Sequence, residues 1–114
     1  MIIKNLEDVP FANLRGYQSV TKKIVIGPDD GSNEIVLRYF SLQPGGKSPH
    51  HAHNFPHVVR IEAGTGVVTD DRGQQHQLQK GDYVFVNDNE VHDFANTGID
   101  PFDFICIVPR RGEA

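Results

Sequence analysis

The amino-acid sequence predicts an all-β protein of the sandwich or barrel class. β-Branched and aromatic residues come in short runs, clusters of Gly, Pro, Asn and Asp separate these runs, and no stretch keeps an apolar 3.6-residue period for the length of a helix. At 114 residues the chain is near the common size of one domain and too short for two separate cores. We therefore expect one domain over residues 1–114 that carries both fold and function.

Five of the expected strands lie in the first half of the chain, where runs of apolar, β-branched and aromatic residues alternate with turn sequences. They are Ile2–Leu6, Ser19–Ile26, Glu34–Leu42, Lys47–His51 and His57–Glu62. Gly27-Pro28-Asp29-Asp30-Gly31 predicts the turn before the third strand, and Gln43-Pro44-Gly45-Gly46 predicts the turn after it. Residues 5–16 have mixed polarity around Pro10, which indicates an irregular connection.

The second half of the chain contains the other five expected strands, which are Gly66–Thr69, Gln74–Gln79, Tyr83–Val86, Val91–Ala95 and Phe102–Val108. Asp70-Asp71-Arg72-Gly73 predicts a hairpin turn between the first two. In the last strand one face is more uniformly apolar than the other, so we expect that face in the barrel interior. Its residues are Phe102, Phe104, Cys106 and Val108. Residues 110–114 are expected to be a frayed tail.

Charge and composition argue against several classes of partner. The formal net charge is −4 and there is no basic stripe, so neither nucleic acid nor an anionic membrane is an expected partner. The sequence shows neither an apolar run of the roughly 18 to 20 residues that span a bilayer nor the features of a signal peptide, which predicts a cytoplasmic protein. The single cysteine, Cys106, excludes an internal disulfide and is expected to be a small buried hydrophobe.

Six histidines are many for so short a chain, and four of them have a spacing that favours a metal site. His51 and His53 are two residues apart, so on an extended segment both point to one face. His57 follows a bend at Pro56, and His92 lies on a later strand. A neutral imidazole is a common metal ligand, whereas an isolated histidine is more often exposed or hydrogen-bonded. The other two, His50 and His76, are assigned to solvent.

The residues around these histidines resemble the two-part signature of the cupins. The first part is matched by Gly45, His51-Ala52-His53, His57 at the usual glutamate position, and Gly64. The second part is matched by Gly81, His92 and Asn96, with Asn87 and Asn89 where the family has Pro and Gly. The resemblance covers residues 45–96 and is closest to the short single-domain cupins with four histidines.

This resemblance implies a cupin-type double-stranded β-helix, a jelly-roll barrel, with one divalent transition metal per chain. The ligands carried over by position are His51, His53, His57 and His92. The family favours manganese, iron or copper, and zinc or nickel remains possible. Four neutral imidazoles leave the ion its full double positive charge and make it a stronger Lewis acid. A tetrahedral zinc site would be closed, whereas octahedral manganese or iron would keep two open positions.

Four further residues are candidates for the pocket beside the metal. Phe94 shares a face with His92, and we expect Phe94, Phe104 and Cys106 either to line the pocket or simply to pack in the core. Arg38 is the single charge on the face that it shares with Val36, Phe40 and Leu42. It would either hold a substrate carboxylate or lie along the surface with its guanidinium in water.

Three functions are compatible with such a site. The leading expectation is an oxidoreductase of dioxygenase type that acts on a small organic substrate. The alternatives are a non-catalytic module that binds a small ligand with a structural metal, and a metal-dependent isomerase or decarboxylase, for which no general base stands out among Lys, Tyr or carboxylate residues.

We also expect a homodimer. Residues 2–6 form an apolar segment whose free edge would otherwise invite uncontrolled pairing. Laying this strand on the sheet of a second copy would bury the segment twice and close the assembly.

Overall fold

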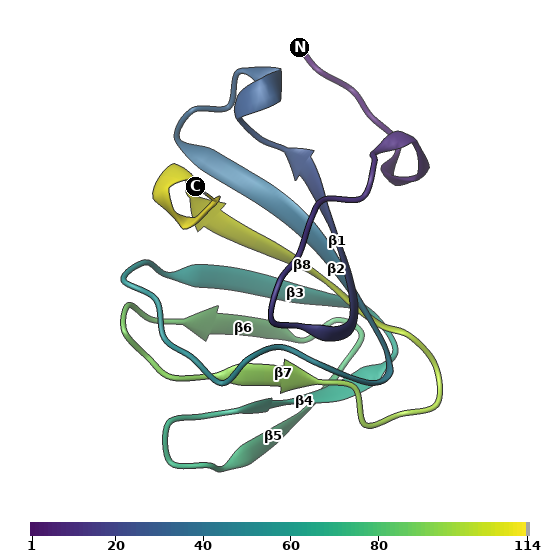
Figure 1. Cartoon of the computed structure of the whole chain (residues 1–114), viewed down its shortest axis with the longest axis vertical. Coiled ribbons are helices and arrows are strands. Elements are labelled where there is room, and N and C mark those ends of the chain that lie inside the picture. The colour runs from purple at the N-terminus through teal and green to yellow at the C-terminus, as the bar shows by residue number, and fades with distance from the viewer. Residues whose placement is uncertain (114) are drawn as a thin grey trace.

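The computed structural model describes residues 1–113, whose strands form one curled antiparallel sheet (Figure 1). The strands are β1 (Gln18–Ile26), β2 (Ile35–Lys47), β3 (His57–Ala63), β4 (Thr65–Thr69), β5 (Gln75–Gln79), β6 (Tyr83–Val86), β7 (Asp93–Ala95) and β8 (Phe102–Pro109). Their order across the sheet is β5-β4-β7-β2-β8-β3-β6, and β1 pairs with β2 outside this path. The all-β barrel that the sequence predicts is confirmed.

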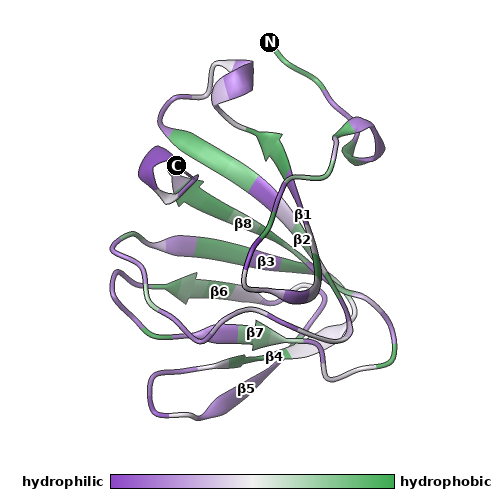
Figure 2. Cartoon of the chain, in the orientation of Figure 1, coloured by the Kyte–Doolittle hydropathy of each residue, from purple (hydrophilic) through white to green (hydrophobic). Residues whose placement is uncertain are grey.

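The pairing of β2 with β8 determines which residues face the interior. Arg38 lies opposite Cys106 and Phe40 opposite Phe104, and burial alternates along both strands. The apolar face of β8 is therefore buried as expected, together with Val36, Phe40 and Leu42 of β2. Figure 2 shows that hydrophobic residues follow β8 while β5, at one edge of the sheet, is hydrophilic.

The segment Gln43-Pro44-Gly45-Gly46 is not the turn that the sequence predicts, because β2 continues through it to Lys47. Its ladder with β1 extends to the pair Gln18 and Lys47, with a register shift between Gln18 and Val20. Gly45 adopts a φ of 82°, and a Cβ at Gly46 would lie 2.7 Å from the Ser19 carbonyl oxygen. The glycines therefore build a bulge inside one long strand, which bends the strand without ending it.

Two expectations about the chain termini are wrong within this single chain. Residues 2–6 form no strand: Leu6–Asp8 is the 3-10 helix η1, which begins where the Asn5 side chain accepts a hydrogen bond from the Glu7 backbone N–H. The outer edge of β1, the nearest strand, is already bridged by Ala12, and Ile3 is 85% exposed. At the other end, residues 110–113 form the 3-10 helix η3 (Arg110–Glu113) and are not frayed, because the Glu113 side chain makes ion pairs inside the barrel. The last residue of the expected tail, Ala114, lies outside the described residues.

The remaining differences concern element boundaries. The expected strand Lys47–His51 is divided, since β2 ends at Lys47 and His51 makes an isolated bridge with His92. The strand expected from Val91 begins at Asp93. A third 3-10 helix, η2 (Pro28–Asp30), joins β1 to β2. No helix in residues 1–113 has the length and apolar character needed to cross a membrane.

Candidate metal centre and pocket

Backbone pairing brings His51 and His92 together although they are far apart in the sequence. The His51 N–H donates to the His92 carbonyl at 3.1 Å, and the His92 N–H donates to the His51 carbonyl at 2.9 Å. Residues directly opposite in an antiparallel pair place their side chains on the same face. The two imidazole centroids are accordingly 5.3 Å apart.

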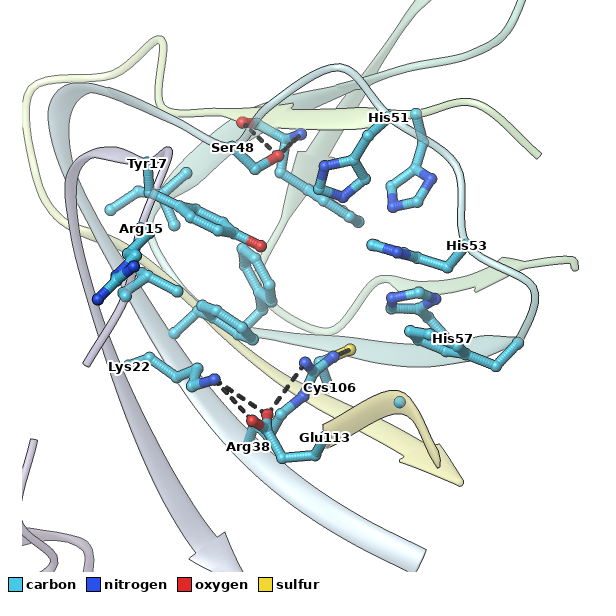
Figure 3. A pocket seen from close by; sticks show the side chains of 18 of the residues that line it. Arg15, Tyr17, Lys22, Arg38, Ser48, His51, His53, His57, Cys106 and Glu113 are labelled. Carbon is cyan, nitrogen blue, oxygen red and sulfur yellow. Dashed lines mark hydrogen bonds and ion pairs between the residues drawn. The ribbon is translucent and has the colours of Figure 1, made fainter. Parts of the chain in front are cut away.

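His53 approaches this pair from the loop that leads into β3, and His57 is the first residue of β3. His53 follows His51 by two residues, and their ring centroids are 4.2 Å apart. The ligand nitrogens of His51, His53 and His92 all lie within 4.8 Å of one another. The His57 ring stands next to this trio, with its centroid 4.9 Å from that of His53 and 5.2 Å from that of His92. We call these four residues, which Figure 3 shows in part, the histidine cluster.

The nitrogens of His51, His53 and His92 lie close enough together to hold a metal ion. The Nδ1 atom of His92 lies 2.9 Å from the Glu90 carbonyl oxygen, so Nδ1 carries the proton and Nε2 keeps a free lone pair. The Nδ1 atom of His57 is buried and has no hydrogen-bond partner among residues 1–113. A buried polar atom without a partner is costly, and a metal ion would satisfy it. The trio is thus assembled as expected, and His57 as a fourth ligand stays a prediction.

Burial keeps the imidazoles of His51, His53 and His57 neutral. Desolvation, reinforced by neighbouring histidines, lowers the pKa of His53 to about 4. Desolvation, followed by the charge of Arg38, lowers the pKa of His57 to about 3, and the pKa of His51 also falls, mainly through desolvation. At neutral pH these rings are therefore unprotonated, which is the form that binds metals.

The histidine cluster lines a cavity of about 340 Å³ inside the barrel. The four pocket candidates from the sequence, Arg38, Phe94, Phe104 and Cys106, all lie on its wall. The Phe104 ring packs against Phe94 and Phe40, with centroids 4.8 and 5.4 Å apart, and Phe40 stacks on Tyr17 at 6.2 Å. One part of the wall is thus a stack of aromatic rings suited to a planar organic molecule.

Of the two environments expected for Arg38, the one in water is wrong, and the contact with a substrate carboxylate stays a prediction. Its guanidinium is not in water: the residue is 8% exposed, Nη1 lies 3.3 Å from Glu113 Oε1, and Nη2 lies 3.0 Å from Cys106 Sγ. Lys22 joins from β1, with Nζ 3.0 and 2.9 Å from the two carboxylate oxygens of Glu113. We call Lys22, Arg38 and Glu113 the charged cluster.

Among the wall residues that sequence reasoning missed are three with titratable side chains, Tyr17, Lys22 and Glu113. Lys22 alternates with Val20 and Ile24 along β1, a pattern that would have placed it on the inward face. Tyr17 lies at the end of a connection without periodicity, and nothing in the sequence connects Glu113 with Lys22, 91 positions earlier.

Two further titratable groups of the cavity stay protonated at neutral pH. Burial raises the pKa of the Cys106 thiol, an effect that the Arg38 charge only partly opposes. Burial likewise raises the pKa of Tyr17. The cavity therefore presents a neutral thiol and a phenol that can donate a hydrogen bond.

The two histidines assigned to solvent lie away from the cavity. His50 is exposed, with Nδ1 2.6 Å from Asp93 Oδ2, and His76 is exposed, with Nε2 3.0 Å from Asp70 Oδ2. Neither residue belongs to the group of histidines whose ligand atoms converge.

Comparisons with known proteins agree with this architecture. The cupin domain model of the Cupin_2 family matches residues 38–108. No curated protein matches the chain by sequence. Among solved structures, the polyketide cyclase RemF from Streptomyces resistomycificus is 25% identical with a TM-score of 0.91, over 96% of this chain and 80% of that chain.

Two more distant structures share the fold. A predicted oxalate decarboxylase from Thermotoga maritima is 21% identical with a TM-score of 0.83, over 95% of this chain and 98% of that chain. A sugar phosphate isomerase from Silicibacter pomeroyi is 20% identical with a TM-score of 0.78, over 93% of this chain and 74% of that chain. The expected double-stranded β-helix is thereby confirmed.

Proposed function

The chain belongs to the cupin domain family, and from this premise we propose that it is a metal-dependent enzyme that acts on a small organic substrate containing a carbonyl group. The reaction class that we favour is a non-oxidative rearrangement or ring closure assisted by a Lewis acid. One observation carries the proposal: the histidine cluster shares its cavity with a phenol, an ammonium and a carboxylate, from Tyr17, Lys22 and Glu113. From the sequence alone, no such proton-transfer group stood out.

We propose that the histidine cluster holds one divalent ion. The trio His51, His53 and His92 would supply three nitrogens and His57 the fourth. Imidazole donors suit zinc, copper, iron and nickel, and the family resemblance adds manganese. When bound, the ion would polarise a carbonyl oxygen of the substrate and stabilise the negative charge that develops on it.

The other residues of the cavity would bind and orient the substrate. The aromatic rings of Phe40, Phe94 and Phe104 would exclude water and favour a flat molecule packed against them. Tyr17, which burial keeps protonated, would donate a hydrogen bond or a proton to a substrate oxygen. The Glu113 carboxylate would neutralise Lys22 and Arg38 while the cavity holds no substrate.

The similarity to RemF supports a ring closure. That protein is described as a polyketide cyclase, and at 25% identity it matches 96% of this chain. Cyclisation of a polyketide joins two carbon atoms of a chain rich in carbonyl groups, so it is chemistry that a Lewis acid beside an aromatic wall would assist. The other two structures are below 25% identity and support the fold alone.

Oxidation by dioxygen is the second candidate, and one observation favours it. The cluster presents only imidazole nitrogens, a donor set that suits iron and copper. Under this alternative the protein would be an oxidoreductase of dioxygenase type, which is the leading expectation from the sequence. A non-catalytic module that binds a ligand beside a structural metal would use the same cavity without turnover.

The experiment that separates these functions measures metal content and then turnover with and without dioxygen. Full-length protein, reconstituted separately with manganese, iron, copper, nickel or zinc, would be mixed with linear 1,3-diketones and poly-β-keto acids, and loss of their enol absorbance followed. We expect turnover under argon at an unchanged rate. Turnover that needs dioxygen and consumes it would favour the dioxygenase, and stoichiometric metal without turnover would favour the binding module. Protein that retains no metal would contradict the proposal.

A further inference from the structure

The charged cluster lies on the wall of the same cavity as the histidine cluster (Figure 3). Lys22 pairs across the strands with Phe40, and Arg38 is two residues from Phe40 on the same buried face of β2. This places the ammonium of β1 beside the guanidinium of β2. Their shared counter-ion, Glu113, comes from η3, which follows β8 at the end of the described chain.

The two cations are not fully satisfied by this one carboxylate. Within residues 1–113, Arg38 Nε is buried without a hydrogen-bond partner. Nη2 of Arg38 has only the Cys106 sulfur, a weak acceptor, and Nη1 meets a single oxygen of Glu113 at 3.3 Å. A guanidinium pairs best with two oxygens at once. Arg38 therefore has unused hydrogen-bonding capacity, and the cluster carries an excess of one positive charge.

The shape of the surroundings indicates what kind of anion would fit. The Arg38 guanidinium lies over the Phe40 ring, 5.1 Å from its centroid, and Phe40 stacks with both Tyr17 and Phe104. A flat ring would continue this stack while its attached carboxylate reached the two cations. A small aromatic carboxylate combines both features.

Glu113 is held in a way that allows it to leave. It lies in a four-residue 3-10 helix, outside the strand ladders, so its displacement would break no strand pairing. Its own carboxylate already occupies the position that an incoming carboxylate would take, between Lys22 and Arg38.

We propose that Lys22 and Arg38 form a subsite for a small aromatic carboxylate, and that the Glu113 carboxylate fills this subsite when no ligand is bound. Glu113 then competes with a substrate anion for Lys22 and Arg38, so the anion must bind these two cations more favourably than the Glu113 carboxylate does. As a statement about the enzyme's substrate this inference rests on the proposed function, whereas the anion subsite itself needs no metal.

The test is calorimetric titration of the full-length chain with benzoate, and with benzamide as its uncharged counterpart. Each titration is made on metal-loaded protein and on protein freed of metal and chelator. We expect benzoate to bind in both forms, and benzamide at least tenfold more weakly. In Glu113→Gln the competing charge is gone, so benzoate should bind at least fivefold more tightly than to the wild type.

Matched variants separate the subsite from a general charge effect. Glu62 pairs with Arg60 outside the cavity, with Oε2 3.0 Å from the Arg60 Nη1 atom, so Glu62→Gln makes the same change in net charge and should leave benzoate affinity unchanged. Arg38→Gln should weaken benzoate binding at least tenfold, and Arg60→Gln should not. If Arg38→Gln does not fold, Lys22→Gln tests the same subsite.

Several outcomes would overturn the proposal. Equal benzoate affinity in wild type and Glu113→Gln, or weaker binding in the variant, would show that Glu113 does not compete. Binding that vanishes on metal removal would place the carboxylate on the metal. Because the metal-free titration is independent of turnover, a subsite without catalysis contradicts only the proposed function, and catalysis without the subsite contradicts only this inference.

Discussion

The histidine cluster and the charged cluster lie on one cavity and use different means to bury basic groups. The imidazoles of His53 and His57 lose their charge, because desolvation lowers their pKa to about 4 and about 3. Arg38 cannot lose its proton in a protein, so it is paired with the Glu113 carboxylate. A weak base is therefore buried at little cost as a neutral ligand, whereas a strong base needs a counter-ion.

The largest expected effect is on metal affinity, which depends on the neutral imidazoles of the histidine cluster. His51→Ala and His92→Ala should each weaken metal binding more than about 100-fold, since losing a residue that only supports a ligand already costs about 10- to 100-fold. Metal content after dialysis against a competing chelator measures this. His76→Ala, the exposed control, should bind metal like the wild type.

Variants of His57 test whether the site has a fourth ligand, because His57 lies beside the trio and not within it. His57→Ala should weaken metal binding less than His51→Ala and leave a three-histidine site. His57→Glu should retain the metal and lower the charge of the site by one, which would change the spectrum of the bound ion. Unchanged metal content and spectrum in His57→Ala would show that His57 is not a ligand.

The next effect concerns the charged cluster and the free energy of unfolding. Glu113→Ala should lower this free energy by about 2 to 4 kcal/mol, because removing one partner of a buried ion pair leaves unpaired charges behind. Urea denaturation of wild type and variant measures the difference. Glu62→Ala, which disrupts a half-buried ion pair whose side chains are more exposed, should have a smaller effect. An equal loss in both variants would contradict the distinction between buried and more exposed pairs.

A smaller, graded effect is expected from pH on the metal-free protein. The pKa values of His53 and His57 are lowered in the folded state, so between the ordinary value of 6.5 and about 4 the unfolded chain binds more protons. Stability from these residues is complete above about pH 6.5 and is lost as the pH falls toward 4. Urea denaturation at several pH values should show a flatter dependence in the double variant His53→Gln, His57→Gln. An equally steep dependence would contradict the lowered pKa values.

The smallest effect on the cavity is expected from the N-terminal segment. We propose that the protein is a homodimer in which Ile2 and Ile3, exposed by 55% and 85% in the single chain, pack on a second copy. Deleting residues 1–5 should shift sedimentation equilibrium toward monomer and lower the thermal midpoint, while metal content stays nearly the same. A monomer mass that is independent of concentration in the full-length chain would contradict the dimer.

Local pattern was enough to predict most strands and part of the site. Alternation along Phe102–Val108 identified the buried face of β8, because successive side chains of a strand point to opposite faces. The spacing of His51 and His53, together with the resemblance around His92, predicted the trio that the structure assembles. The strand boundaries predicted around Gly45 were wrong. Turn residues also build bulges, and whether a segment forms a turn or a bulge depends here on its pairing with β1.

The sequence by itself determined the class of fold and the histidine cluster, because the first follows from the two-residue alternation of side chains along strands and the second from a compact motif. Only the tertiary structure decided the charged cluster. Lys22 and Glu113 are 91 positions apart and lie on different elements, so nothing local relates them. They meet because the barrel curls β1 and the end of β8 around one interior, where the buried charge of Arg38 requires an anion that only a distant part of the chain supplies.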